Sequence, residues 1–199
     1  MGIIKLTVWP VIRTSVGSTN LEIKDLTMKR LALFLFALMS LALAGCSMTS
    51  NLHRAQETTY LPADSKFTVG ETVDNSGYVF ADPKEKFSLS DSFTGSLNAA
   101  ISMEGLAGSN ATYVIKTKIT EYAPGNAFTR WIIPGAGATK LSTESIVYTT
   151  DNIEVARIPV HRSIAAGGGY TIDAWKYVFE DVAKETVKVI KTQLVVPKG

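Results

Sequence analysis

The chain has 199 residues, 46% of them hydrophobic and 19% charged, with a formal net charge of +2 and a single cysteine. Five of the 20 basic residues and two of the 18 acidic residues lie upstream of Cys46, which leaves 15 basic and 16 acidic residues from Cys46 onward. This near-neutral balance argues against nucleic-acid binding, which needs a clustered basic surface. One cysteine excludes a disulfide within the monomer, and about 150 residues suffice for one core without such a bridge.

An export signal is indicated by residues 28–45. Met28, Lys29 and Arg30 supply a positive start, residues 31–44 form an apolar run, and Gly45 is a small residue at the end. This order is that of a secretory signal peptide. The apolar run has about 14 residues, whereas a helix needs about 20 to cross the hydrocarbon core, so we do not expect a permanent membrane span.

The motif Leu43-Ala44-Gly45-Cys46 resembles the lipobox of bacterial lipoproteins. The resemblance implies cleavage between Gly45 and Cys46, a diacylglycerol on the Cys46 thiol, and anchoring of the mature protein by its acyl chains. Ser47 follows instead of Asp, which in that family implies sorting to the outer membrane, facing the periplasm. The alternative is that Cys46 is a buried thiol at the end of a core helix.

The segments around this signal suggest the organisation of the rest of the chain. Residues 1–27 match no targeting layout, so we hypothesise that translation starts at Met28; a long genuine leader is the alternative. Residues 46–62 begin with the lipidated Cys46 and are mostly polar, which predicts a flexible tether. Residues 63–199 are expected to form one globular domain.

The first half of this domain is predicted to contain a short strand at residues 66–69 and a helix over residues 88–106. Ser88 or Ser90 can cap that helix, because a serine side chain accepts a hydrogen bond from a backbone N–H of the first turn. Residues 112–122 alternate between apolar and polar, which predicts a strand covered on one face.

The second half is predicted to add a strand at residues 128–133 and a glycine-rich bend at residues 134–138. A hairpin follows, with strands at residues 141–149 and 153–163 and a turn at residues 150–152. Residues 173–194 carry an apolar stripe at helical spacing, which predicts a long amphipathic helix. The expected fold is α+β, with two helices packed on one face of a mostly antiparallel sheet, an α/β sandwich.

The motifs of this part resemble a family of uncharacterised bacterial lipoproteins known only as a domain of unknown function. The resemblance rests on Asn126 to Arg130, the glycines at 135 and 137, the turn at Asp151-Asn152 and the glycines at 167–169. At fold level it extends to the small periplasmic modules of curli-secretion lipoproteins and of lipoprotein activators of penicillin-binding proteins. It implies an envelope interaction module and assigns no catalytic residue.

Few residues suggest chemistry. His53 lies in the predicted tether and His161 on a predicted strand, and no His-Glu-x-x-His or Cys-x-x-Cys motif supports a metal site. Residues 134–140 lack the Gly-Lys-Ser/Thr ending of a phosphate loop and are better explained as a hinge or bulge. Arg130 and Trp131 are a candidate contact for an anionic ligand or a peptidoglycan peptide, or simply the edge of an amphipathic strand. We predict no catalytic residue, metal or cofactor.

Two functions remain open from the sequence. The first is a non-enzymatic lipoprotein that binds or scaffolds a cell-envelope protein or peptidoglycan, held at the membrane through Cys46. The second is an envelope hydrolase in which Glu121 and Glu144, on neighbouring strands, act as an acid/base pair. The first is favoured because no catalytic constellation is recognisable.

Overall fold

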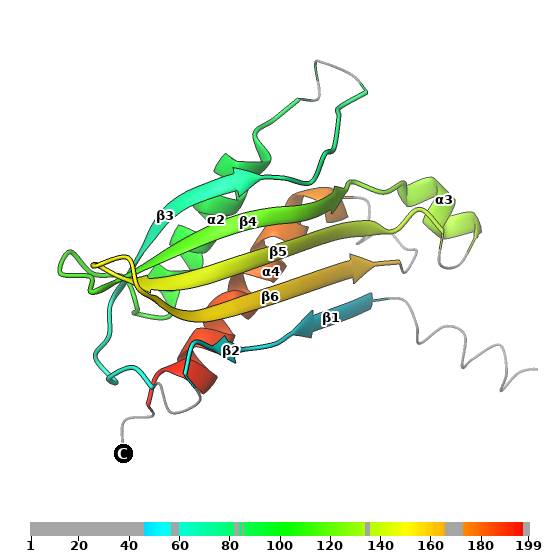
Figure 1. Cartoon of the computed structure of the whole chain (residues 1–199). Coiled ribbons are helices and arrows are strands. Elements are labelled where there is room, and N and C mark those ends of the chain that lie inside the picture. Colours follow the sequence, from blue (N-terminus) through cyan, green and yellow to red (C-terminus); the bar gives the residue numbers. More distant parts are fainter. Residues whose placement is uncertain are drawn as a thin grey trace, which may run out of the picture. The chain divides into compact units, whose positions relative to one another are not determined.

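A six-stranded sheet carries the fold (Figure 1). Its strands lie in the order β1 (Cys46–Ser50), β6 (Glu154–Ile164), β5 (Thr139–Thr149), β4 (Tyr113–Ala123) and β3 (Phe67–Asp74), and the two-residue β2 (His53–Arg54) also pairs with β6. This computed structural model describes residues 46–56, 60–81, 84, 86–133, 136–165 and 173–196. The predictions for residues 1–27 and for the signal peptide at residues 28–45 therefore lie outside the described residues.

The pairing of the described strands is antiparallel except between β3 and β4. These two strands are parallel because α2 (Leu89–Met103) lies between them in the chain and crosses back over the sheet, as parallel neighbours require. The β5–β6 hairpin turns at residues 150–153, where Asn152 adopts a left-handed conformation with φ 61°. Asparagine tolerates this conformation, which confirms the predicted turn chemistry.

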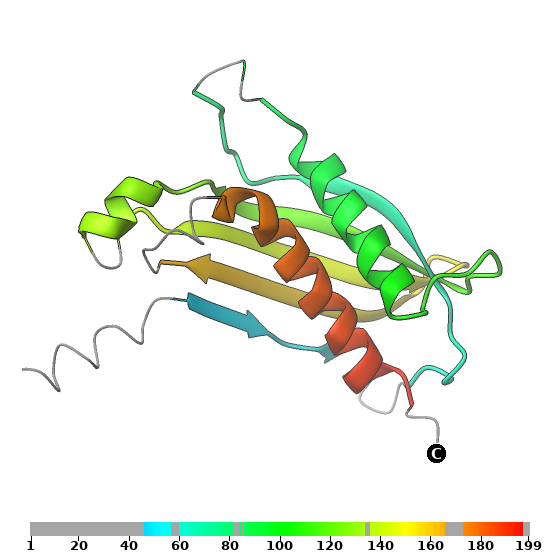
Figure 2. The same ribbon diagram turned by 180° about the vertical axis from the view of Figure 1, so that it is seen from behind.

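Two helices cover one face of the sheet, as the sequence predicts (Figure 2). In α2, the Ser88 side chain accepts a hydrogen bond from Asp91 N at 3.1 Å, the expected N-cap. The second helix, α4 (Ala174–Val189), continues into a π-helical turn, η4 (Ile190–Leu194). The apolar stripes of both helices are buried against the sheet: Phe93, Leu97, Ile101, Val178, Val182 and Val189.

The helix-covered face of β5 is more polar than a typical core strand. Leu141 and Val147 are fully buried, but Thr143 and Ser145 lie between them on the same face and are also buried. Ser145 Oγ and Thr117 Oγ1 on β4 share a hydrogen bond of 2.9 Å, which satisfies both hydroxyl groups. Thr143 Oγ1 has no hydrogen-bond partner among the described residues.

The predicted tether is wrong for residues 47–54, because β1 and β2 belong to the sheet. Cys46 pairs with Ile164 and Ser50 with Val160, so the strand is aligned with β6 from its first residue. Hydrophobic periodicity missed β1 because the strand lies at the edge of the sheet and only Met48 packs against the core from it. Backbone pairing, which polar residues support equally well, holds such a strand.

The segment predicted as a strand at residues 128–133 is instead mainly a short helix, α3 (Ala127–Ile132). Asn126 caps it, accepting a hydrogen bond from Thr129 N at 3.0 Å. The aromatic and β-branched residues of this segment favour a strand, but the capping asparagine favours the start of a helix.

Candidate functional site

The face of the sheet opposite the helices is polar. Side chains alternate along each strand, so the residues between the buried positions of β4, β5 and β6 point away from α2 and α4. This helix-free face carries a mixture of cations, carboxylates and hydroxyl groups: Lys116, Lys118, Thr120, Ser142, Glu144, Arg157 and His161.

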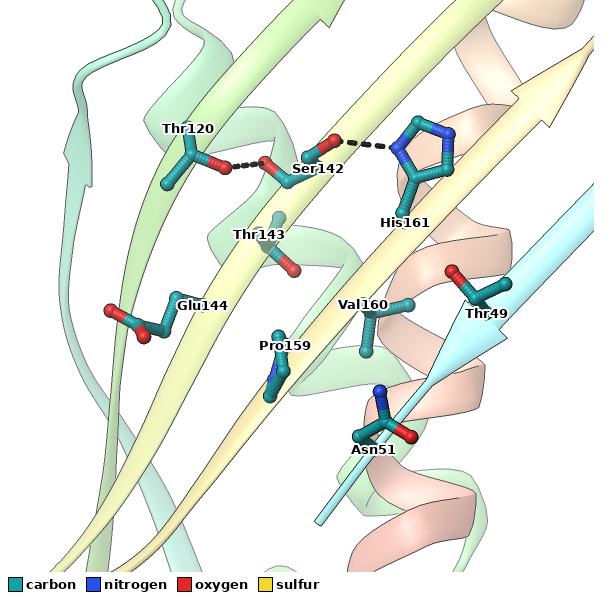
Figure 3. Close-up of a pocket in the computed structure, with 9 residues that line it drawn as sticks. All are labelled: Thr49, Asn51, Thr120, Ser142, Thr143, Glu144, Pro159, Val160 and His161. Atoms are coloured by element: carbon teal, nitrogen blue, oxygen red, sulfur yellow. Dashed lines mark hydrogen bonds between the residues drawn. The ribbon is translucent and has the colours of Figure 1, made fainter. Parts of the chain in front are cut away.

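A shallow groove of about 290 Å³ opens on the helix-free face where β1 meets β6 and β5 (Figure 3). Most of its lining residues are polar, and Pro159 supplies an apolar side chain; Thr143 and Val160 border the groove, although their side chains are buried on the helix-covered face. β1 forms one wall, so the groove depends on the strand that the sequence failed to predict. The lining residues are Thr49, Asn51, Thr120, Ser142, Thr143, Glu144, Pro159, Val160 and His161.

Ser142, His161 and Glu121 form a hydrogen-bonded cluster beside the groove. Ser142 Oγ donates to Glu121 Oε2 at 2.9 Å and lies 2.7 Å from His161 Nδ1. A hydroxyl has one proton, so while it donates to Glu121 it accepts from a protonated His161 Nδ1. Figure 3 shows the His161 ring beside Ser142, on the neighbouring strand.

This arrangement differs from that of a hydrolytic triad. In a triad the serine donates its proton to the histidine, and a carboxylate orients the far side of the imidazole ring. Here Ser142 donates to Glu121. Ser142 Oγ, at 2.7 Å, and Glu121 Oε2, at 3.6 Å, both lie beside the same nitrogen of His161, Nδ1. The hydroxyl is therefore held between two polar partners, and its proton is directed to Glu121 and not to His161.

The two glutamates of the hydrolase hypothesis lie on the same face but have different partners. Glu121 contacts Ser142 and forms an ion pair of 3.6 Å with Lys140. Glu144 lines the groove and lies 2.9 Å from the guanidinium of Arg157, which also binds Glu154 at 3.0 Å. The hydrogen bond to Glu144, and to a smaller extent the one to Glu154, raises the pKa of Arg157 above its usual value. Glu144 is thus held in an ion pair.

The other residues proposed from the sequence are dispersed. Cys46 is exposed at the start of β1, and His53 on β2 pairs with Arg157 in the backbone ladder. Arg130 and Trp131 lie in α3, and their side chains are outside the described part of the structure. Among the described residues, no three His, Cys, Asp or Glu side chains gather where they could hold a metal ion.

Residues 74–168 match the family model of a domain of unknown function, DUF4410. The match supports the resemblance to a domain-of-unknown-function family. It runs from the last residue of β3 past the end of β6, so it includes α3 and most of the groove and excludes Cys46, β1 and α4. No curated protein matches the sequence.

Several solved structures show a distant likeness. The PelC L103M dodecamer from Paraburkholderia phytofirmans is 12% identical, with a TM-score of 0.48 over 74% of this chain and 99% of that chain. A putative lipoprotein from Caulobacter crescentus is 16% identical (TM-score 0.38, 66% and 88%), and a minor lipoprotein from Acinetobacter baumannii is 12% identical (TM-score 0.32, 62% and 91%). Similarities this distant identify neither a shared function nor a shared partner.

Proposed function

We propose that this chain is a membrane-anchored lipoprotein that acts without catalysis and presents the groove on its helix-free face to a partner in the bacterial cell envelope. The observation that carries the proposal is the position of Cys46. It follows Leu43-Ala44-Gly45, as a lipidated cysteine follows its lipobox, and it is exposed at the first residue of an edge strand. An exposed thiol there is accessible to acylation, whereas the alternative of a buried core thiol requires burial.

A binding role fits the groove better than a catalytic one. Its hydroxyl and imidazole groups come from four strands, β1, β4, β5 and β6, and together with the amide of Asn51 they offer hydrogen bonds to an extended polar ligand such as a peptide. The carboxylates of Glu121 and Glu144 already have cationic or hydroxyl partners. We therefore propose an envelope protein or a peptidoglycan peptide as the partner, with Arg130 and Trp131 of α3 as further candidate contacts.

The proposed location is the inner leaflet of the outer membrane, facing the periplasm. Ser47 after the lipidated cysteine supports this choice over the inner membrane. Within the described residues, no helix is both long and apolar enough to cross a membrane. Attachment would then depend on the acyl chains at Cys46, since two or more chains give stable anchoring where one is marginal.

The anchor is tested by metabolic labelling with an alkyne fatty acid, followed by membrane fractionation, of the wild type and of Cys46→Ala. We expect label and membrane association in the wild type, and in Cys46→Ala we expect loss of the label and release of most of the protein from the membrane. Ser47→Asp is the matched variant for sorting: it should keep the label and move the protein to the inner membrane. Cys46→Ala protein that is recovered with the membranes as completely as the wild type would contradict the proposal.

The binding role is tested by pull-down on purified peptidoglycan sacculi and by crosslinking in intact cells. Ser142→Ala and His161→Ala should each reduce retention on sacculi, or the yield of one reproducible crosslinked envelope protein, at least severalfold. Ser96→Ala on α2, on the opposite face of the sheet, is the control and should bind like the wild type. If Ser142→Ala and His161→Ala bind as well as Ser96→Ala and the wild type, the groove is excluded as the binding surface.

A further inference from the structure

α3 and Ile133, the residue that follows it, expose a concentrated set of large apolar side chains. Phe128 is 68% exposed, Ile132 53% and Ile133 55%, all within six consecutive residues. Exposed large hydrophobic residues elsewhere, such as Met103 and Ile153, come from separate elements. Scattered apolar residues are ordinary on a protein surface, but a contiguous group marks a surface that contacts a partner or a membrane.

The connection that carries α3 has a defined geometry. Its base is closed by hydrogen bonds from Asn126 N to Gly137 O at 2.9 Å and from Thr139 Oγ1 to Pro124 O at 2.7 Å. Asn126 then caps the helix itself. These bonds fix the position at which the apolar group leaves the sheet, between the end of β4 and the start of β5.

The lipidation candidate lies at the same end of the sheet. Cys46 pairs with Ile164, and Ile164 pairs with Thr139, so the first residue of β1 and the first residue of β5 are level with each other. They are two strand spacings apart, or about 10 Å. Figure 1 shows α3 at the end of the sheet where β1 begins and β6 ends.

We propose that Phe128, Ile132 and Ile133 form a second membrane contact that inserts into the lipid surface beside the acyl chains on Cys46. The inference rests on the proposed lipid anchor. Because β1 is paired with β6 from Cys46 onward, no linker separates the anchored residue from the sheet. The acyl chains therefore bring this end of the sheet to the membrane, and α3 meets lipid there.

A lipid surface fits this group better than a protein partner because of where it lies. A partner protein at this end of the sheet would compete with the membrane that the anchor already holds there. Short elements with exposed aromatic and aliphatic residues bind at the boundary between headgroups and acyl chains, and a second contact strengthens lipid anchoring. The neighbouring residues Arg130 and Trp131 are of types common in that boundary.

The contact would also fix the height of the groove above the membrane. Thr49, which lines the groove, is three residues after Cys46 on β1. Three residues of a strand span about 10 Å, so the groove would open close to the lipid headgroups. Its partner must then be able to reach the membrane surface.

The test is site-specific photocrosslinking with the full chain expressed in bacteria, so that any processing and acylation proceed normally. The photoreactive residue p-benzoylphenylalanine replaces Phe128 in one variant and Ile132 in a second. Ile153, which is 62% exposed in the turn at the opposite end of the hairpin, is the matched control position. Phospholipids labelled metabolically with an alkyne report crosslinks to lipid, and a separate alkyne fatty-acid culture reports acylation of Cys46.

We expect phospholipid crosslinks from positions 128 and 132 at least fivefold above those from position 153. An acylated protein whose crosslinks from both α3 positions equal those from position 153, or go to a protein instead, overturns the membrane contact and leaves the anchor intact. If Cys46 carries no acyl label, the anchor itself fails.

A vesicle experiment tests the contact without the anchor. Full-chain Cys46→Ala protein is floated with phosphatidylethanolamine–phosphatidylglycerol vesicles, alone and with Phe128→Asp and Ile132→Asp added. Weak binding that these changes reduce at least fivefold, and that Ile153→Asp leaves unchanged, supports the proposal. Binding that does not depend on α3, or no binding, overturns it.

Discussion

Ser50 Oγ on β1 donates a hydrogen bond of 2.8 Å to the carboxylate of Glu185 on α4. The two residues are 135 positions apart in the chain. This bond fastens the edge strand that begins with Cys46 to the C-terminal helix, in addition to its backbone pairing with β6. The docking of β1, and with it one wall of the groove, therefore depends partly on one ionised side chain.

We predict that Ser50→Ala lowers the free energy of unfolding by about 1 kcal/mol at pH 7, the typical net contribution of such a hydrogen bond. Burial raises the pKa of Glu185, but hydrogen bonds from Ser50 and Lys188 lower it by more, so that it lies below its ordinary value. A carboxyl group whose pKa is lower in the folded state stabilises the fold at pH values above its unfolded-state pKa. This contribution is lost as the pH falls through the folded-state pKa. The difference between the wild type and Ser50→Ala should thus shrink below about pH 4.5.

Urea unfolding of the purified protein at several pH values measures this difference. Ser47→Ala is the matched control, because Ser47 lies on the same strand but on the opposite face. It should unfold like the wild type at every pH. A Ser50→Ala penalty that persists undiminished at pH 3 would show that Glu185 ionisation has no part in it.

A second prediction concerns Tyr122, whose hydroxyl is buried without a hydrogen-bond partner among the described residues. Burial, with a smaller contribution from Tyr78, raises the pKa of Tyr122 well above its ordinary value. Because the pKa of Tyr122 is higher in the folded state, the free energy of unfolding is unaffected below about pH 10. It decreases at higher pH, because the tyrosine ionises readily only in the unfolded chain. The wild type should therefore lose about 1.4 kcal/mol more than Tyr122→Phe between pH 9 and pH 11.

Unfolding of both proteins across this range, monitored by circular dichroism, checks the prediction. At pH 7, Tyr122→Phe should be as stable as the wild type or more stable, because it removes an unsatisfied hydroxyl. Tyr60→Phe is the control, since Tyr60 is 57% exposed and remains in water in both states. Parallel pH curves for wild type and Tyr122→Phe would contradict the burial argument.

Sequence periodicity predicted the elements whose stability comes from an apolar stripe. The helices α2 and α4, the strand β4 and the β5–β6 hairpin all bury residues at regular spacing, so their positions follow from the pattern. The strand β1 has no such stripe, and α3 is too short for a helical period to appear. The predictions for both segments, a tether and a strand, were therefore wrong. Both segments lie at the end of the sheet where we propose that the membrane is.

The Ser142–His161 contact shows why the groove could not be predicted. The predicted turn fixes the hairpin only to within one residue. A β-bulge between Val147 and Tyr148 shifts the register, so Ser142 pairs with His161. Without the bulge, the pairing of Tyr148 with Glu154 would continue along the hairpin and place Ser142 opposite Val160. His161 and Ser142 would then point to opposite faces of the sheet.

A third prediction concerns two buried threonines on the helix-covered face of the sheet, Thr143 on β5 and Thr117 on β4. Thr143→Val replaces a buried hydroxyl that has no partner among the described residues by a methyl group of similar size, and should raise the free energy of unfolding by about 1 kcal/mol. Thr117→Val removes a hydroxyl bonded to Ser145 and should lower it by about 1 to 2 kcal/mol, because Ser145 is then left unsatisfied. Thermal and urea unfolding distinguish the two, and equal effects of both changes would contradict the assignment of Thr143 as unsatisfied.

The last prediction concerns Gly137, at the base of the α3 connection. Its φ is 65°, and an added Cβ would lie 2.8 Å from Asn126 O and 2.9 Å from Thr129 Cβ. Gly137→Ala must therefore strain the backbone and displace the cap of α3, which should lower the free energy of unfolding by about 1 to 3 kcal/mol.

Gly95→Ala is the matched control. Gly95 is an exposed helical residue of α2, and its added Cβ would meet no atom within 4 Å. This change should raise the free energy of unfolding by about 0.5 to 1 kcal/mol. Urea unfolding measures both changes, and the lipid crosslinks from position 128 should decrease in Gly137→Ala but not in Gly95→Ala. A stable Gly137→Ala protein with undiminished crosslinks would show that the precise geometry at the base of α3 is not needed to hold its apolar side chains at the membrane.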